Sequence, residues 1–292
     1  VVHRLVYGSE YYSTENKTLR DGGTTEALTG VTVREFFPLP TRDFPVTKVD
    51  QLAFFVQDEI ELMNGRLILS PGIRYDDFEA KATADAIYLA GNPGISAPED
   101  FSDSEVTAKL GVVYEFTSDL SIYGNVSEGF RAPPYDDVNV GFTNFIGGYK
   151  TISNAALESE TSIGYEIGTR LRGGWGSVNV AVFKNDYENF IESLATAPAF
   201  AGSGGIDPAD GLLTFQSVNL SEVEIKGLEF SGELSLAPLN DSLEGSAFKF
   251  ALAYAEGENI AAAEPLDSIE PLSAVFGLTY DAPSGKWGGD LV

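Results

Sequence analysis

The feature that most constrains this chain is the two-residue period of its apolar positions. Between residues 52 and 62 the even positions are mostly apolar, whereas the odd positions are mostly polar, as at Gln57 and Glu59. The dipeptide Asn64-Gly65 then leads into a second alternating segment, and Asn-Gly in that setting is a strong β-hairpin signal. Alternation of this kind places apolar and polar side chains on opposite faces of a strand. The pattern therefore predicts antiparallel β-structure.

Similar segments recur along the chain, and their connectors alternate between short and long. We expect eleven strands, over residues 3–13, 48–62, 66–78, 105–117, 119–129, 160–172, 175–190, 217–236, 247–256, 271–281 and 287–292. The long connectors are 14–47, 79–104, 130–159, 191–216 and 257–270. Short turns at one end and long loops at the other are typical of a transmembrane barrel. We therefore predict an all-β fold, an antiparallel transmembrane β-barrel, with a β-bulge where the phase changes at Lys226-Gly227.

The period alone leaves open which face of the sheet meets water. A membrane barrel turns its apolar face to lipid and its polar face inward, whereas a soluble secreted β-sandwich would bury the apolar face. Several expected strands exceed the ~9–11 residues of a tilted bilayer crossing, and aromatic residues gather near strand ends, as at Tyr75 and Trp175. An open sheet would expose unpaired edges to lipid. We therefore expect residues 1–292 to be a partial barrel domain, with about 11 strands of a barrel of ~22.

The composition limits the partners, metal sites and reactions that this chain can support. The chain has 44 acidic and 18 basic residues and a formal net charge of −26. This charge argues against nucleic acid as a partner, because phosphate binding needs clustered Lys and Arg. The chain has no cysteine and one histidine, which excludes thiolate and multi-histidine metal sites. Carboxylates lack His or Cys partners, and no phosphate-binding loop with a lysine occurs. We expect no enzyme activity, no metal site and no permanently bound cofactor.

Two neighbouring boxes carry a resemblance to a known family. The segment Ser127-Glu-Gly-Phe-Arg-Ala-Pro-Pro-Tyr-Asp-Asp137 is similar to the Phe-Arg-Ala-Pro box of TonB-dependent receptors, most closely of their haem and haemoglobin branch. The segment Asn154-Ala-Ala-Leu-Glu-Ser-Glu-Thr-Ser-Ile-Gly-Tyr-Glu-Ile-Gly-Thr-Arg170 resembles the box that follows in that family. Further similar segments are Phe55–Glu59, Leu69–Asp76, and Pro265–Leu272 with its continuation to Trp287. The last is especially like the haemoglobin/transferrin/lactoferrin receptor group.

The resemblance implies a 22-stranded barrel with an N-terminal plug, and we expect the plug and the C-terminal strands to be absent from this chain. It implies an outer-membrane receptor of a Gram-negative bacterium that is embedded in outer-membrane lipid. Such a receptor binds an iron complex at its extracellular loops and imports it with energy from the TonB complex, which acts through the plug. Haem, or haem taken from a host haemoprotein, is the expected transported ligand. The alternatives are a siderophore, such as a ferric chelate, or another metal chelate, and a passive porin if no plug exists.

The resemblance also indicates where the ligand would bind. The candidates come from the two boxes and the residues between them: Phe130, Arg131, Ala132, Pro133, Tyr135, Tyr149, Asn154 and Leu157. Haem receptors of this branch usually carry an axial histidine there, but residues 134–153 contain none. Tyr135 and Tyr149 are therefore the available iron ligands, since tyrosine can ligate haem iron. Four charged residues on polar strand faces are expected to face the lumen: Arg74, Glu166, Arg170 and Glu229.

Overall fold

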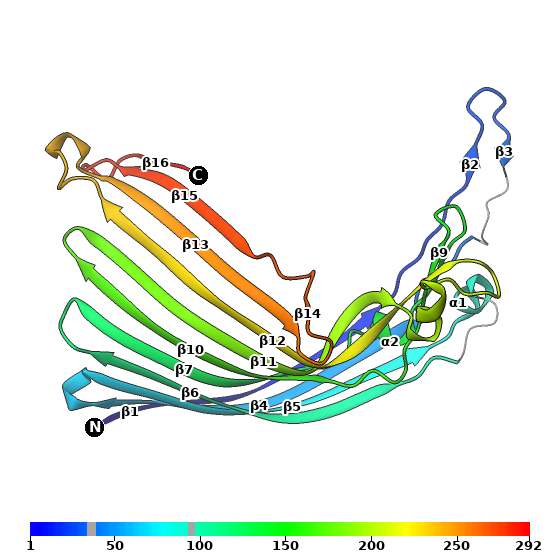
Figure 1. Ribbon diagram of the computed structural model, residues 1–292, viewed down its shortest axis with the longest axis horizontal. Helices are drawn as coiled ribbons and strands as arrows, with labels where there is room; N and C mark the ends of the chain where they lie inside the picture. Colours follow the sequence, from blue (N-terminus) through cyan, green and yellow to red (C-terminus); the bar gives the residue numbers. More distant parts are fainter. Residues whose placement is uncertain (34–38, 93–96) are drawn as a thin grey trace.

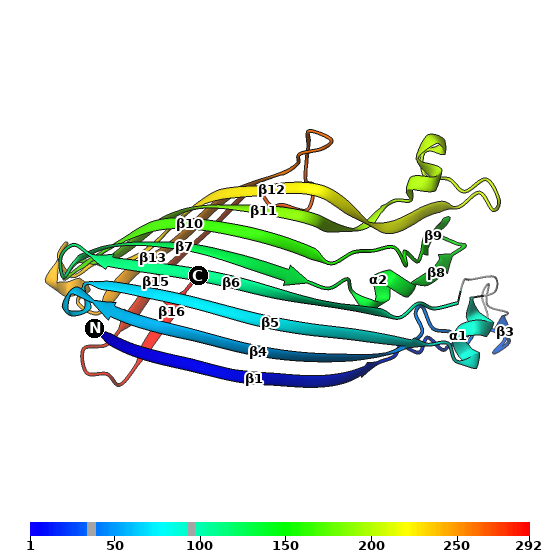
Figure 2. The same cartoon turned by 90° about the horizontal axis from the view of Figure 1, so that it is seen from below.

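A curved antiparallel sheet dominates the computed structural model, which describes residues 1–33, 39–92 and 97–292 (Figures 1 and 2). Its main strands follow one another in the order of the sequence. They are β1 (Val2–Asn16), β4 (Val46–Leu62), β5 (Leu67–Thr83), β6 (Phe101–Glu115), β7 (Leu120–Arg131), β10 (Glu160–Gly173), β11 (Gly176–Thr196), β12 (Leu213–Ser235), β13 (Ser246–Asn259), β15 (Leu272–Asp281) and β16 (Gly288–Leu291). Each of the eleven predicted strands has its counterpart here, and the antiparallel all-β prediction is confirmed.

The long connectors contain structure of their own. Short strands lie at β2 (Thr24–Thr25), β3 (Thr32–Val33), β8 (Gly141–Asn144), β9 (Tyr149–Ile152) and β14 (Glu264–Pro265). Short helices lie at α1 (Ala86–Gly91), α2 (Tyr135–Asn139) and η2 (Pro198–Ser203), and a further one, η3 (Asp241–Leu243), lies in the shorter connector between β12 and β13. The main strands also run further into these connectors than the period predicts, since β11 continues to Thr196 and β12 begins at Leu213. Residues 34–38 and 93–96, in two of the predicted long connectors, lie outside the described residues.

The predicted hairpin at Asn64-Gly65 is confirmed. The turn η1 (Met63–Gly65) joins β4 to β5, and its three residues have φ values of 54°, 59° and 85°. This left-handed region favours glycine and is tolerated by asparagine. The local chemistry of the turn thus accounts for the tight connection between two long strands.

The apolar face of the sheet is its more exposed face. Phe54, Tyr75 and Val106 are cross-strand neighbours on β4, β5 and β6, and between 38% and 51% of each is exposed. On the opposite face, the paired residues Ala53 and Asp76 are only 1% and 7% exposed. A soluble protein would show the reverse distribution. This arrangement contradicts the β-sandwich alternative and agrees with a barrel wall that meets lipid.

In the described part of the chain the sheet is a single curved layer (Figure 1). Phe250, on the apolar face, is nevertheless 9% exposed, because the rings of Phe230 and Phe248 lie 4.8 Å and 6.0 Å from its own ring. Its burial therefore comes from aromatic neighbours in the same sheet rather than from a second layer.

The β-bulge predicted at Lys226-Gly227 is wrong. The pairing of β11 with β12 is uninterrupted there, with Val182 opposite Leu228 and Lys184 opposite Lys226. The strand keeps its register, and the chemistry of each face changes instead. Lys226 lies on the same face as Leu228, whereas Val223 lies on the opposite face and is 1% exposed. The register shift of this strand pair falls between Glu192 and Ala195, on either side of Leu194, whose φ is 58°.

Candidate functional site at the loop end

Four long connectors meet, in their described parts, at one end of the sheet, which we call the loop end (Figures 1 and 2). They are the connectors between β1 and β4, between β5 and β6, between β7 and β10, and between β11 and β12. Backbone hydrogen bonds join them, including that from Gly141 N to Asp43 O at 2.7 Å. The buried side chain of Asn139 accepts from Glu99 N and donates to Glu99 O, both at 2.8 Å. Asn154 Nδ2 donates to Ser217 O at 2.9 Å. Segments far apart in the sequence therefore form one assembly.

An ion pair fixes α1 within this assembly. Arg42 Nε donates to Asp85 Oδ2 at 2.9 Å, and Asp85 Oδ1 caps the helix by accepting from Tyr88 N at 2.8 Å. Burial opposes ionisation of Asp85, but the hydrogen bonds from Tyr88 and Arg42 outweigh it and lower the pKa of this carboxyl. The Tyr88 side chain is 1% exposed and its hydroxyl donates to Asn139 O at 3.3 Å.

The β8–β9 hairpin lengthens the sheet at the loop end. β9 pairs in parallel with the first residues of β12, with Tyr149 opposite Leu213. Lys150 Nζ lies 2.6 Å from Asp207 Oδ2 and 2.8 Å from Asp210 Oδ2, which belong to the connector before β12. Burial disfavours the charged ammonium, but these two carboxylates outweigh it and raise the pKa of Lys150. The connector between β7 and β10 is thereby tied to the connector between β11 and β12.

The Phe-Arg-Ala-Pro box lies where β7 ends. Arg131 Nη1 lies 3.6 Å from Glu160 Oε2 on β10, and the Arg131 side chain is half exposed. Phe130 pairs with Thr161 on the other face of the strand, Ala132 is half-buried, and Pro133 is fully buried. Of these four candidates, Arg131 is the one that combines a charge with access to solvent.

Asn154 and Leu157 support the loop end from within. Besides its bond to Ser217, Asn154 accepts from Ala156 N through Oδ1 at 3.0 Å. Leu157 is 3% exposed and packs in a cluster with Val138 and Ile191. Both polar atoms of the Asn154 amide therefore already have partners within the protein. These contacts favour a packing role for the second box.

The two candidate tyrosines lie in different aromatic clusters. The Tyr135 ring meets Phe44 edge-on at 5.2 Å. The Tyr149 ring lies 5.9 Å from that of Phe142 and 6.2 Å from that of Phe215. Burial and the neighbouring Asp136 raise the pKa of Tyr135, which opposes the tyrosinate that binds iron.

Sequence reasoning missed the partners of these tyrosines. Phe44, Phe142 and Phe215 come from three different connectors or strand ends, and the guanidinium carbon of Arg20 lies 4.7 Å above the Phe142 ring. Arg20 also binds Asp43, with 2.6 Å between Nη2 and Oδ2. Only the frequency of aromatic residues in these connectors could have pointed to them.

The four predicted lumen-facing residues all stand on the polar face of the sheet by strand register. Arg74 Nε lies 2.8 Å from Asp76 Oδ2, and Arg74 Nη2 lies 3.0 Å from Glu10 Oε2. Arg170 lies over the Tyr123 ring, with 5.9 Å between the guanidinium carbon and the ring centroid. A cavity of about 440 Å³ opens on this face beside Arg74, lined also by Glu10, Gln57 and Lys109.

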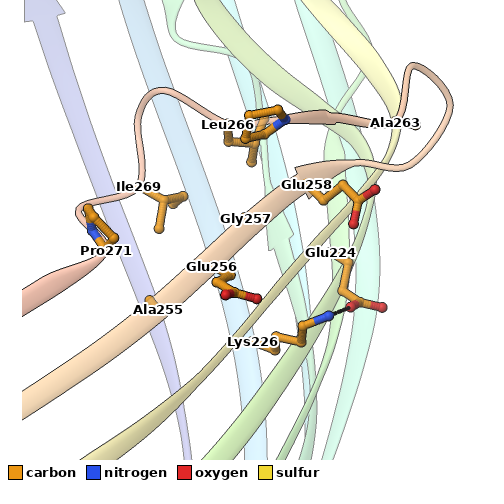
Figure 3. A pocket seen from close by; sticks show the side chains of 11 residues that line it. Glu224, Lys226, Ala255, Glu256, Gly257, Glu258, Ala263, Leu266, Ile269 and Pro271 are labelled. Atoms are coloured by element: carbon orange, nitrogen blue, oxygen red, sulfur yellow. Dashed lines mark hydrogen bonds and ion pairs between the residues drawn. The ribbon is translucent and has the colours of Figure 1, made fainter.

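A second cavity of about 440 Å³ lies between β12, β13 and the segment that follows β13 (Figure 3). Its charged lining comprises Glu224, Lys226, Glu256 and Glu258, and its apolar lining includes Leu266, Ile269 and Pro271. Gly257 allows this segment to pass close by, since a Cβ atom there would lie 2.6 Å from Ile269 Cγ1. Lys226 Nζ is already bound to Glu224 Oε1 at 2.9 Å.

Among residues 1–33, 39–92 and 97–292, no three His, Cys, Asp or Glu side chains are grouped so as to hold a metal ion. Within the same ranges, no helix has the length and apolar content needed to cross a membrane.

Comparison with known proteins decides the family. The sequence matches the family described as TonB dependent receptor-like, beta-barrel over residues 2–292. The chain belongs to this family of TonB-dependent receptors. The resemblance inferred from the two boxes is thus confirmed, and proteins of this family are located in the outer membrane of Gram-negative bacteria.

Similar TonB-dependent receptors include haemoglobin-binding proteins. Hemoglobin-haptoglobin utilization protein B of Neisseria meningitidis serogroup C is 28% identical over 242 residues, which cover 77% of this chain and 29% of that protein. Hemoglobin and hemoglobin-haptoglobin-binding protein of Haemophilus ducreyi is 25% identical over 253 residues, which cover 79% of this chain and 25% of that protein. The chain therefore spans less than a third of the length of these relatives.

Solved structures share the fold. The copper transporter OprC superposes with a TM-score of 0.67 at 18% identity, over 99% of this chain and 39% of that one. The ferric citrate transporter FecA in its unliganded form superposes with a TM-score of 0.64 at 18% identity, over 96% and 37%. These relatives and structural neighbours are receptors and transporters rather than enzymes.

Proposed function

We propose that the full-length protein is an outer-membrane receptor that captures haem, free or from a host haemoprotein, and imports it in a TonB-dependent way. The observation that carries the proposal is the similarity to haemoglobin-binding receptors over 77% of this chain. The energy would come from the TonB complex and act through a plug that is encoded outside residues 1–292. The loop end would meet the ligand first, and the polar face of the sheet would line its route.

The geometry favours Tyr149 over Tyr135 as the iron ligand. Tyr149 lies in an aromatic cluster whose flat rings suit stacking against a porphyrin. Tyr135 is packed against Phe44, and its raised pKa opposes tyrosinate formation. Arg131, half exposed at the end of β7, supplies a positive charge for a propionate or another anionic group of the ligand.

A haemin titration of the purified full-length receptor, followed by absorbance, tests this assignment. Tyr149→Phe should weaken haemin binding at least about tenfold and change the absorption spectrum of the bound haem, whereas Tyr135→Phe should bind as the wild type does. Tyr165→Phe is the matched control, because Tyr165 lies on the apolar face of β10. Equal binding by Tyr149→Phe and wild type would contradict the assignment of the ligand.

A ferric chelate is the second candidate ligand. The observation that favours it is the lack of a histidine in residues 134–153, where the haem branch usually has one. The same titration separates the two candidates. A wild-type receptor that gives no haem absorbance change but binds a ferric siderophore would replace the haem proposal with this one.

A further inference from the structure

A groove lies on the apolar, outward face of the wall. It is a cavity of about 460 Å³ that spans β6, β7, β10 and β11. Its floor is Gly124 on β7, which has Val112 of β6 on one side and Ile167 of β10 on the other. The two apolar side chains therefore stand on either side of a position that has no side chain of its own.

The backbone does not require a glycine at this position. The pairing of β7 with β6 and with β10 is continuous through Gly124, so no bulge lies there. Gly124 does not have a positive φ, and a Cβ atom added to it would make its nearest contact at 3.4 Å, with Glu166 O. A glycine inside a strand weakens the strand and often marks the close approach of another molecule.

The part of the groove nearest the loop end carries a positive charge. One step from the floor towards the loop end, the cross-strand neighbours that line the groove are Leu110, Val126, Tyr165 and Lys184. Lys184 lies directly opposite Lys226 on β12, and the two side chains are 46% and 52% exposed. Like charges directly opposite each other destabilise a sheet, so this pair favours an added anion.

The carboxylates beside this pair hold the two ammonium groups together without using all their donors. Glu224 bridges them, with its Oε2 3.0 Å from Lys184 Nζ and its Oε1 2.9 Å from Lys226 Nζ. Asp186 Oδ1 also lies 3.0 Å from Lys184 Nζ. Because an ammonium has three N–H donors, both lysines keep a donor for a further acceptor.

Outward lysines occur on one side of the wall. Along the described main strands they are Lys48, Lys81, Lys184 and Lys226, and each lies on the loop-end side of the apolar outward stretch. Within these same described strands, the outward positions near the short turns carry no lysine. Lys48 and Lys81 also lie directly opposite each other. A role in folding alone would not favour one leaflet, whereas a head group found in the outer leaflet would.

We propose that the groove binds a phosphate-bearing lipid of the outer leaflet, with an acyl chain along Gly124 and a head-group phosphate at Lys184 and Lys226. Hydrocarbon suits the apolar sides of the groove, and lysine is a common binder of phosphate. Tyr165 lies between the two parts of the site, where an aromatic ring with a polar tip suits the membrane interface. The lipid is held by the wall and is not the transported ligand, so the site is independent of the proposed function.

The phosphate contact is tested on the full-length receptor in detergent, with lipopolysaccharide as the probe and native mass spectrometry as the readout. Wild type should bind the intact lipid at least about tenfold more tightly than the same lipid stripped of its phosphates. Lys184→Gln/Lys226→Gln should bind the intact lipid at least about tenfold more weakly and should no longer distinguish the two. Lys249→Gln is the matched control, because Lys249 is 50% exposed on the inward face of β13.

The acyl-chain contact is tested by filling the groove. Gly124→Leu should weaken binding of both forms of the lipid by the same factor, roughly fivefold or more, because its side chain occupies the place of the acyl chain. Gly124→Ala, which adds one carbon atom without a clash, should weaken both forms by a smaller factor. Gly111→Leu is the matched control, since it adds the same side chain on the polar face of β6.

Each contact can be overturned separately. If wild type binds the intact and the dephosphorylated lipid equally, the phosphate contact at Lys184 and Lys226 is wrong. If the two Gly124 variants bind lipid as tightly as the wild type does, the acyl chain does not lie in the groove. If inorganic phosphate displaces the lipid completely, the lysines bind a free anion and the lipid site is overturned. Thermal unfolding of each variant shows whether a loss of binding comes from a loss of structure.

Discussion

The outward face of the sheet is apolar along the wall and becomes charged towards the loop end. On β12 the outward side chains of Leu228 and Phe230 are apolar and 44% and 38% exposed. Four residues from Leu228 along the same face, Glu224 binds Lys226 and Lys184 at 2.9 Å and 3.0 Å. One regular strand therefore passes from an apolar surround to an aqueous one without any change in backbone geometry.

This change of polarity indicates where the bilayer ends. The apolar outward stretch from Leu228 to Leu236 has the length of one tilted crossing, ~9–11 residues. Beyond it, ion pairs on the outward face need water, because charges cost free energy in hydrocarbon. The polarity of the outward residues, rather than the length of the strand, marks the boundary between wall and loop end.

The largest expected effect comes from placing a charge in the wall. Val180 faces outward on β11 opposite Phe230, and Val180→Lys should destabilise the full-length receptor by ~2–4 kcal/mol because a lysine near the bilayer midplane loses its hydration. Chemical unfolding in lipid bilayers measures the effect. Glu188→Lys, on the same face of the same strand but beyond the boundary, should change stability by less than about 0.5 kcal/mol. Equal destabilisation by the two variants would contradict the distinction between the wall and the region beyond the boundary.

A smaller effect is expected on the polar face of the wall. A Cβ atom at Gly168 would lie 2.3 Å from Cζ of Tyr123, whose hydroxyl donates to Asn179 at 3.2 Å. Gly168→Ala should therefore destabilise the receptor by ~1–3 kcal/mol, as overpacking does. Gly111→Ala is the control, since its nearest contact there is an ordinary 3.5 Å to Ser70 Cβ. Recovery of stability in Gly168→Ala/Tyr123→Ala would identify the ring as the cause, and no recovery would point elsewhere.

At the loop end the expected effects are local. Lys150→Met leaves Asp207 and Asp210 without their shared cation, so the β9–β12 pairing should open more often. Hydrogen exchange at residues 213–216 should accelerate about tenfold while the wall strands stay unchanged. Lys226→Met, which removes an exposed ion pair from the outward face, should leave exchange at the loop end unaltered. Faster exchange throughout the sheet would show that wall and loop end unfold together.

The smallest effect is a pH dependence confined to α1. The folded-state pKa of Asp85 is lowered, so its ionised form stabilises the helix above the unfolded pKa of ~3.9 and this stabilisation is lost as pH falls through the folded value. Exchange protection of α1 should be constant from pH 7 down to about 4 and decline below it. In Asp85→Asn, protection should be lower at neutral pH and no longer fall on acidification. A decline that begins near pH 6 would contradict the role of this carboxylate.

The sequence by itself determined the wall. Period-two alternation separates the two faces of each strand, Asn64-Gly65 supplies the turn that its φ values require, and the alternation of short and long connectors sorts the strand ends. All of this information is local, because the side-chain period and the turn chemistry act over a few residues. The family boxes are also contiguous, so Phe130–Pro133 and the following segment could be recognised without a structure.

Only the tertiary structure decided which segments meet at the loop end and how far along a strand the apolar outward face extends. Lys150 binds Asp207, which lies 57 residues further along the chain, and Tyr149 meets Phe215 through a parallel pairing that has no local signal. The change of apolar phase at Lys226-Gly227 has two local explanations, a bulge or a change of surroundings, and only the register with β11 separates them. The physical reason is the same in each case, since these features depend on what lies beside a residue in space, and alternation along the chain records only which face it occupies.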